Sequence, residues 1–363
     1  MNVLLVRLRL IGDVVFPPPA IHALRRHLPG ARLTYLVERG AAPVVDTLPE
    51  LDEVLVVAHS HGWRRLRDDL RLARRLRATR FDVAFDFHGG PRAAWLTWAS
   101  RAPLRAGYEI AGRTWMYTHV VSRSRELRPR HSVVNQWDLL RTAFPDIGDP
   151  DPERDPVRMG DHPAADASIG ARWARAGLQA TAVIVIHVSA GNPFRRWPPE
   201  AFETLVTRLA AGHANRRIIL TSGPSDAGAA ARISAAARRQ LGPDAASRIV
   251  DFGDLPLAEL RALVCRAALF IGGDSGPLHV AATTRTPIVA IFGPTLAARS
   301  APWRSPTLVT EAVDAGPLPC RPCDQRRCQP GDFRCLRALA PEAVVEAAER
   351  ALFRSGNHGV NAG

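Results

Sequence analysis

The sequence predicts an α/β protein with two Rossmann-like domains, each a parallel sheet covered by helices. Three observations support this fold class. Short apolar, β-rich runs alternate with helical patterns along the chain. A segment rich in Pro, Gly and charge, residues 145–156, interrupts the alternation and is typical of an interdomain linker. The length of 363 residues is sufficient for two domains with separate cores.

The elements follow one another in the order expected for two such domains. The predicted strands are residues 3–8, 33–37, 54–57, 81–87, 182–188, 217–221, 268–271 and 288–292. Predicted helices include residues 20–28, 200–211 and 257–266. We therefore expect an N-terminal domain at residues 1–155, a C-terminal domain at residues 156–340, and a last segment, 341–363, with a helix at 342–353.

The composition restricts the class of protein and its partners. The 46% hydrophobic content indicates a globular chain, and no apolar stretch is long enough to span a bilayer. The N-terminus does not resemble a signal peptide, so we expect a cytoplasmic protein. All 48 basic residues are arginines, which we attribute mainly to genomic base composition. The net charge of +13 still favours acidic partners: phosphorylated lipids, anionic membrane or nucleic acid.

Residues 63–80 carry eight arginines on a helical pattern. One interpretation is an amphipathic helix with a solvated outer face, which packs on the sheet through residues such as Leu66, Leu70 and Leu76. The other is a helix that rests against anionic lipid.

The most informative segment is an apolar run that stops at two glycines and leads through Asp274 and Ser275 into a helix start at Gly276. The free N–H groups at that helix start and the positive end of its dipole predict a site for a phosphate or a pyrophosphate. His279 lies in the same first turn and is within reach of the same anion. The alternative is an ordinary strand-to-helix turn with a capping aspartate.

Asp13 follows the first predicted strand. Because ligands of open α/β sheets bind beyond the carboxyl ends of the strands, this position places Asp13 at a cleft. A helix N-cap is the alternative role for the same aspartate.

Three segments in order resemble the ADP-heptose:lipopolysaccharide heptosyltransferase family, glycosyltransferase family 9. They are V-L-L-V-R-L-R-L-I-G-D-V from residue 3, I-V-I-H-V-S-A-G-N-P-F-R-R-W-P from residue 184, and G-G-D-S-G-P-L-H-V-A-A from residue 272 with P-I-V-A-I-F-G-P-T after it. The resemblance implies a GT-B fold, in which two parallel sheets face a central cleft. It also implies that the last segment, 341–363, crosses back to the N-terminal domain.

The resemblance implies a role for each matching residue. Asp13 would be the general base, and Arg195 would replace a lysine of the family as the cation near the leaving group. The implied donor-binding residues are Ser189, Gly191, Asn192, Asp226, Asp274, Ser275, Gly276 and His279, although capping a helix explains Asp226 equally well. The candidate acceptor-binding residues are Arg9, His88 and Arg92. His88 ends a predicted strand of the first domain and would receive an acidic acceptor together with Arg92, and a structural role for this histidine is the alternative.

The resemblance implies an inverting, metal-independent monomer that moves heptose from ADP-heptose to the inner core of lipid A-linked lipopolysaccharide. It would lie at the inner face of the inner membrane and bind no nucleic acid. The alternatives are a nucleotide-sugar epimerase, a transferase for another sugar, a dinucleotide oxidoreductase and a nucleic-acid binder. The oxidoreductase is disfavoured because the first βα turn has no G-x-G-x-x-G.

Four cysteines cluster as Cys320, Cys323, Cys328 and Cys335. A cytosolic chain keeps such thiols reduced, so disulfides are not expected. Four thiolates are also able to form a tetrahedral zinc site. We expect no metal for catalysis, and we favour a cysteine cluster without zinc over a structural zinc site.

Overall fold

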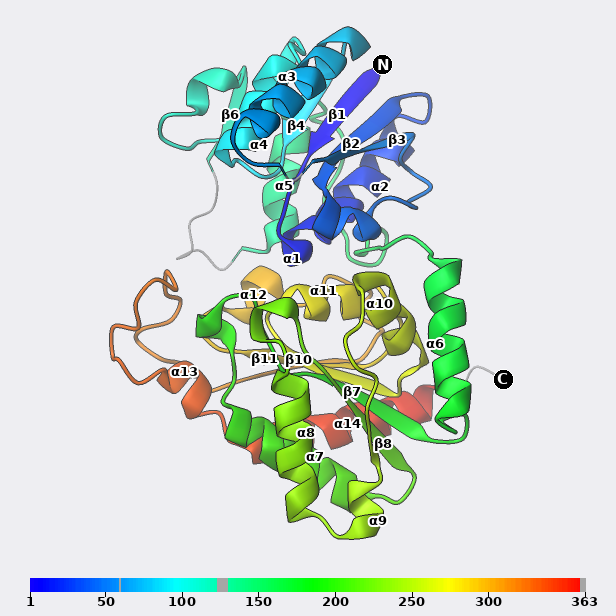
Figure 1. The fold of residues 1–363 in the computed structure, drawn as a ribbon. Helices are drawn as coiled ribbons and strands as arrows, with labels where there is room; N and C mark the ends of the chain where they lie inside the picture. The colour runs from blue at the N-terminus through cyan, green and yellow to red at the C-terminus, as the bar shows by residue number, and fades with distance from the viewer. Residues whose placement is uncertain (59, 123–129, 360–363) are drawn as a thin grey trace. The chain divides into compact units, whose positions relative to one another are not determined.

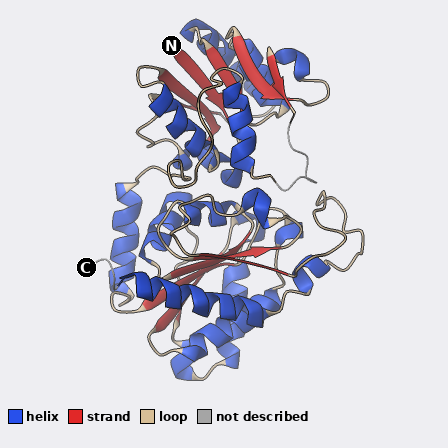
Figure 2. Ribbon diagram, turned by 180° about the vertical axis from the view of Figure 1, so that it is seen from behind, coloured by secondary structure: helices blue, strands red, loops and turns tan. Residues whose placement is uncertain are grey.

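The computed structural model describes residues 1–58, 60–122 and 130–359 (Figure 1). The chain divides into two compact units, Met1–Asp161 and His162–Gly363. Both units are α/β, with helices on the two faces of a parallel sheet (Figure 2). This confirms the predicted fold class of two Rossmann-like units.

The first unit contains these elements in chain order: β1 (Asn2–Val6), α1 (Ile11–Val14), α2 (Pro17–His27), β2 (Arg32–Glu38), η1 (Arg39–Val44), β3 (Glu53–Val57), α3 (Gly62–Thr79), β4 (Val83–Asp86), α4 (Pro91–Ala99), β5 (Leu104–Tyr108), η2 (Thr114–Met116), β6 (His119–Val121) and α5 (Ser132–Arg141).

The second unit contains α6 (Pro163–Arg175), β7 (Ala182–His187), η3 (Pro193–Arg195), α7 (Pro199–Gly212), β8 (Arg216–Thr221), η4 (Pro224–Asp226), α8 (Ala229–Gln240), α9 (Pro243–Ala246), β9 (Ile249–Val250), α10 (Leu257–Arg266), β10 (Leu269–Gly273), α11 (Gly276–Ala282), β11 (Ile288–Phe292), α12 (Ala297–Ser300), β12 (Thr310–Asp314), α13 (Arg334–Arg337) and α14 (Pro341–Gly359).

The two sheets share one strand order. The first runs β3-β2-β1-β4-β5-β6 and the second β12-β11-β10-β7-β8-β9, each six-stranded over the residues described. In both sheets the order reverses beside the first strand of the unit, between β1 and β4 and between β7 and β10. Such a switch point leaves a crevice at the carboxyl ends of the two strands, where ligands bind in open α/β sheets. A candidate site is therefore expected at each of these two points.

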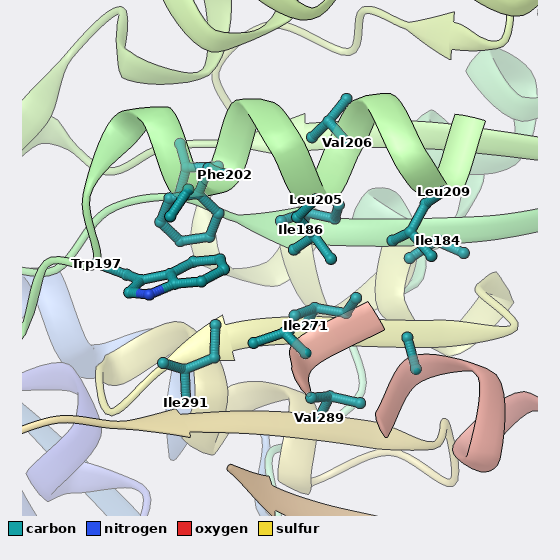
Figure 3. Packing of buried hydrophobic residues seen from close by; sticks show 14 of the residues in the cluster. Ile184, Ile186, Trp197, Phe202, Leu205, Val206, Leu209, Ile271, Val289 and Ile291 are labelled. Atoms are coloured by element: carbon teal, nitrogen blue, oxygen red, sulfur yellow. The ribbon is translucent and has the colours of Figure 1, made fainter. Parts of the chain in front are cut away.

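In the core of the second unit, apolar residues at helical spacing on α7 pack against apolar residues at every second position of β7 (Figure 3). Phe202, Leu205 and Leu209 recur at helical spacing, so they share one side of α7. Ile184 and Ile186 alternate along β7 and share one face of the sheet. All five side chains are at most 2% exposed and belong to one cluster. Strands covered on both faces become continuous apolar runs, which is why the sequence reveals them.

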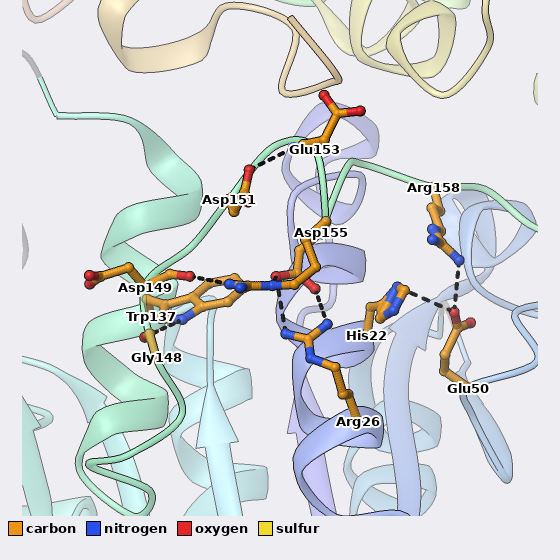
Figure 4. Close-up of polar contacts among 11 residues, drawn as sticks. His22, Arg26, Glu50, Trp137, Gly148, Asp149, Asp151, Glu153, Asp155 and Arg158 are labelled. Carbon is orange, nitrogen blue, oxygen red and sulfur yellow. Dashed lines mark hydrogen bonds and ion pairs between the residues drawn. The ribbon is translucent and has the colours of Figure 1, made fainter.

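The proline-rich segment 145–156 differs from the predicted linker because polar contacts attach it to the first unit (Figure 4). The carboxylate of Asp155 is fully buried and accepts hydrogen bonds of 2.6 and 3.2 Å from Arg26 of α2. Trp137 of α5 donates to the carbonyl of Gly148 at 3.1 Å. The division between the units therefore falls at Asp161 and His162 rather than at residue 155.

The last helix, α14, belongs to the second unit. Val344, Ala347 and Ala351 are fully buried in the same cluster as β10 and β11. Glu349 pairs with Arg216 of β8 at 2.5 Å. The apolar side of α14 is therefore covered by the second sheet. That the last segment crosses back to the N-terminal domain stays a prediction. Among the residues described, no helix combines the length and apolar character needed to span a bilayer.

Candidate functional site

Asp13 lies beside the switch point of the first sheet, in α1 directly after β1. Its carboxylate contacts the guanidinium of Arg7 at 2.6 Å and its side chain stays 41% exposed. Arg7 is buried and also donates to the carbonyl of Phe87, which follows β4. A buried guanidinium that spans the two strands thus holds a partly exposed carboxylate in place. Asp13 lies where a ligand would be expected, with Arg7 as the residue that positions it.

Asp86, the last residue of β4, fixes the loop that follows it. The carboxylate is fully buried and accepts hydrogen bonds from Tyr117 Oη at 2.6 Å and from the backbone N–H groups of His88 and Gly89 at 2.8 and 2.9 Å. The Tyr117 ring reaches it across Gly107, where any Cβ would overlap that ring. Burial raises the pKa of Asp86, and these hydrogen bonds oppose the rise. Asp86 thereby positions His88, whose Nδ1 accepts from the N–H of Leu8 at 3.3 Å.

The three predicted acceptor residues lie in different surroundings. The Arg92 guanidinium is mostly buried and pairs with Asp69 of α3 at 2.5 Å and with Glu38 of β2 at 3.7 Å. Those two contacts give it a structural role in joining helices to the sheet. Arg9 is exposed, and His88 is hydrogen-bonded within the loops after β1 and β4. Acceptor binding by these residues remains a prediction.

The second sheet carries a compact charged cluster at its switch point. Asp274, directly after β10, contacts Arg195 Nη1 at 3.0 Å and His279 Nε2 at 3.5 Å. Burial alone would raise the pKa of Asp274, but the hydrogen bond from His279 and the charge of Arg195 outweigh it and lower the pKa to about 2. The carboxylate is therefore ionised at neutral pH and orients two nitrogen donors. The structure brings together three residues that the sequence suggested separately, and we name Arg195, Asp274 and His279 the donor cluster.

Gln325 is a site residue that sequence reasoning missed. Its Oε1 accepts hydrogen bonds from Arg195 Nε at 2.6 Å and from Asn192 Nδ2 at 3.0 Å. Its Nε2 donates to Thr295 Oγ1 at 3.3 Å. Gln325 thus ties the loop after β7 to the loop after β11, and it fixes the direction of the Arg195 guanidinium. No local signal marks this glutamine, which lies in the cysteine-rich segment.

Ser189 connects two loops. Its hydroxyl accepts a 2.7 Å hydrogen bond from the N–H of Gly223 and lies 3.2 Å from His187 Nε2. The other ring nitrogen of His187 lies 3.0 Å from Thr221 Oγ1. Burial lowers the pKa of His187 to about 4, so this histidine is neutral at neutral pH. Ser189 therefore shapes the loops after β7 and β8. Gly191, two residues further on, has open space where a Cβ would lie.

The turn into α11 has the predicted form. Ser275 is extended, and Gly276 begins the helix. The buried Ser275 hydroxyl has no hydrogen-bond partner among the described residues. A Cβ at Gly273 would lie only 3.3 Å from the carbonyl oxygen of Arg195, so glycine lets the two loops approach closely. The turn thus offers an unused hydroxyl next to the donor cluster.

Asp226 lies apart from this turn. It pairs with Arg232 at 3.0 Å and Arg196 at 3.7 Å, and all three residues line a cavity of about 580 Å³. The donor cluster does not line that cavity. The predicted contact of Asp226 with the donor remains a prediction.

The four clustered cysteines line one cavity of the second unit, together with Phe194 and Phe333. Burial raises the pKa of the Cys335 thiol to about 11, and the neighbouring thiols add to the rise. Within the described part of the chain, no group of three or more histidine, cysteine or acidic side chains is arranged to hold a metal ion. The absence of a metal requirement remains a prediction for experiment.

Comparison with known proteins agrees with this geometry. The chain is 26% identical over 327 residues to lipopolysaccharide heptosyltransferase 3 of Escherichia coli, covering 88% of this chain and 91% of the relative. Its fold is similar to that of a glycosyl transferase family 9 protein from Veillonella parvula, with a TM-score of 0.78, 20% identity and 97% of both chains covered. It is also similar to E. coli ADP-heptose lps heptosyltransferase II, with a TM-score of 0.75, 17% identity, and 98% of this chain and 100% of that one covered.

These neighbours agree with the GT-B class expected for two Rossmann-like units. The model of glycosyltransferase family 9 (heptosyltransferase) matches residues 69–331, which is more than half of the chain. The matched region contains the donor cluster and three of the four clustered cysteines, Cys320, Cys323 and Cys328. The chain therefore belongs to glycosyltransferase family 9.

Proposed function

We propose that this glycosyltransferase moves heptose from ADP-heptose to the inner core of lipid A-linked lipopolysaccharide, with inversion at the anomeric carbon. Heptosyltransferases make up its family, and its relatives include lipopolysaccharide heptosyltransferases 3 and 1 of Escherichia coli and Pseudomonas aeruginosa. The main structural support is the buried, ionised Asp274, which holds Arg195 and His279 at the switch point of the second sheet.

The donor cluster suits a diphosphate leaving group. As the bond between the anomeric carbon and the diphosphate oxygen breaks, negative charge grows on that oxygen. Donors fixed in advance stabilise such charge more than mobile ones. Arg195 supplies a forked cation held by Gln325, and His279 and the free Ser275 hydroxyl supply further hydrogen-bonding groups. ADP is the leaving group under this proposal.

Asp13 suits the activation of the acceptor. An acceptor hydroxyl attacks the anomeric carbon and forms the new C–O bond as the diphosphate departs. The hydroxyl proton passes to the Asp13 carboxylate, which acts as general base. Arg7 holds that carboxylate while leaving part of it open to the acceptor. In this scheme Arg7 is a positioning residue and Asp13 the catalytic one.

The proposal places the enzyme at the cytoplasmic face of the inner membrane, as a monomer with no nucleic-acid partner. A lipid-linked acceptor lies in that membrane, so the enzyme must work at an anionic surface. The excess of arginine over acidic residues favours such a surface by long-range attraction.

A nucleotide-sugar screen tests the donor. The purified chain should be stabilised by ADP and ADP-heptose more than by UDP, GDP or their sugars, measured by thermal shift. A ligand present at a hundredfold excess over its dissociation constant adds about 2.7 kcal/mol of stability. Stabilisation by a different nucleoside diphosphate and not by ADP would contradict the assigned donor.

Chelation should leave the initial rate of transfer unchanged. Arg195 and His279 meet the charge of the leaving group, so no divalent ion is required. The measurement compares initial rates in EDTA with rates in added Mg²⁺ or Mn²⁺. Loss of rate that Mg²⁺ restores would contradict the metal-independent scheme. Zinc release accompanied by unfolding would instead assign a structural ion to the cysteine cluster.

A further inference from the structure

Helix α3 carries nearly all the excess charge of the first unit. Its 18 residues include seven arginines and two aspartates, a net charge of +5. Residues 1–161 as a whole contain 25 arginines and 19 acidic residues, a net charge of +6. The positive charge is therefore concentrated on one helix.

The same helix leaves apolar side chains in solvent. Ala73 and Leu76, in its second half, are its buried residues. Trp63, Leu66 and Leu70 are 85%, 48% and 41% exposed. The apolar side chains of the first half of α3 are therefore left largely uncovered by the rest of the first unit.

The exposed apolar residues share one side of α3 with arginines. At 3.6 residues per turn, positions 63, 66 and 70 lie close together, and positions 67, 74 and 77 lie among or beside them. We name this set the α3 face; it consists of Trp63, Leu66, Leu70, Arg67, Arg74 and Arg77.

The arginines of the α3 face differ from three others on the helix. Arg65, Arg71 and Arg75 pair with Asp69, Asp68 and Glu53 at 3.8, 3.9 and 2.5 Å. Arg67, Arg74 and Arg77 have no ion pair or side-chain hydrogen bond among the residues described. Their charges are therefore available to an anionic partner outside the chain.

We propose that the α3 face lies in the headgroup region of an anionic lipid bilayer. Trp63, Leu66 and Leu70 enter the boundary with the acyl chains, and the arginines contact lipid phosphates on either side. Aromatic and aliphatic groups flanked by cations match this boundary, whereas a nucleic-acid backbone offers no place for two exposed leucines. A second copy of the chain that paired through the same helix would place two helices of like charge against each other, which is unfavourable. The proposal extends the proposed function by naming the surface that meets the membrane of the acceptor.

Vesicle binding by the full chain tests the α3 face. The vesicles contain either equimolar phosphatidylglycerol and phosphatidylethanolamine or phosphatidylcholine alone. One variant replaces Trp63, Leu66 and Leu70 with serine, and another replaces Arg67, Arg74 and Arg77 with glutamine. We expect each to lower binding to the anionic vesicles by roughly tenfold or more: the glutamine variant loses the attraction of three cations to lipid phosphates, and the serine variant loses the apolar side chains that enter the bilayer. Wild-type binding should fall with added salt and be weak on phosphatidylcholine.

The controls keep this test separate from the proposed function. Phe353→Ser and Arg239→Gln change an exposed aromatic residue and an exposed arginine of the second unit, and both should bind vesicles as the wild type does. Activity on a delipidated, water-soluble acceptor should be unchanged in both triple variants, with circular dichroism to check folding. Vesicle binding equal to wild type in either triple variant would overturn the proposal. A different outcome would assign the arginines to nucleic acid instead. In that outcome the serine variant still binds duplex DNA, and vesicles do not compete with the DNA.

Discussion

Replacing Asp13 with asparagine is expected to lower the rate of transfer by about 10²–10⁴-fold, the usual contribution of a general base. The amide has nearly the shape of the carboxylate but does not accept the acceptor proton. Affinity for ADP, measured by thermal shift, should stay near that of the wild type because Asp13 lies in the first unit and the donor cluster in the second. The measurement is single-turnover transfer at saturating donor and acceptor.

Asp146→Asn is the matched control for this variant. Asp146 is a highly exposed aspartate of the same unit, near His27 and outside the site. Its substitution should leave the rate within a few-fold of wild type. The same modest effect in Asp13→Asn would show that Asp13 is not the general base. The N-cap of α1 is Leu10, so the structure does not support a capping role for Asp13 either.

Removing the Arg195 side chain is expected to lower kcat by about 10²–10³-fold, as for the loss of one fixed donor to a developing anion. Affinity for ADP should fall as well, because the cation faces the diphosphate before and after transfer. Arg195→Lys should recover only part of the rate, since an ammonium group cannot match the forked contacts to Asp274 and Gln325. His279→Ala should weaken ADP binding in the same direction.

Arg208→Ala provides the control for these changes. Arg208 is a half-exposed arginine of α7 that pairs with Glu342 at 2.6 Å, outside the donor cluster. Its loss should leave ADP affinity unchanged. If ADP binds Arg195→Ala and His279→Ala as tightly as the wild type, the donor lies elsewhere in the second unit.

The fold was predictable where strands are covered on both faces. The predicted strand 288–292 coincides with β11, and most of the other predicted strands end within two residues of the observed ones. The strands β5, β6 and β9 were missed; β6 and β9 have only three and two residues, and β5, L-R-A-G-Y, contains an arginine and a glycine. The edge strand β12, T-E-A-V-D, was missed because its residues are only partly buried or exposed and form no apolar run.

The sequence predicted individual residues of the site but not the contacts among them. The motifs suggested Arg195, Asp274 and His279, and the structure brings them into contact. Gln325 lies 130 residues beyond Arg195, so the hydrogen bond between them depends on the tertiary fold. Helix α3 shows the opposite case: Leu66 and Leu70 match the apolar positions of an amphipathic helix, but both side chains stay exposed in the structure.

The most direct measurement is acceptor-dependent transfer from ADP-heptose. The purified chain is incubated with ADP-heptose and a lipid A-linked inner-core acceptor, and the products are followed by mass spectrometry together with the release of ADP. If the chain is a heptosyltransferase, the acceptor gains one heptose for every ADP released, and no ADP appears without acceptor. Release of nucleotide in the absence of acceptor, or an isomerised sugar nucleotide with an unchanged acceptor, would contradict heptosyl transfer and indicate an epimerase.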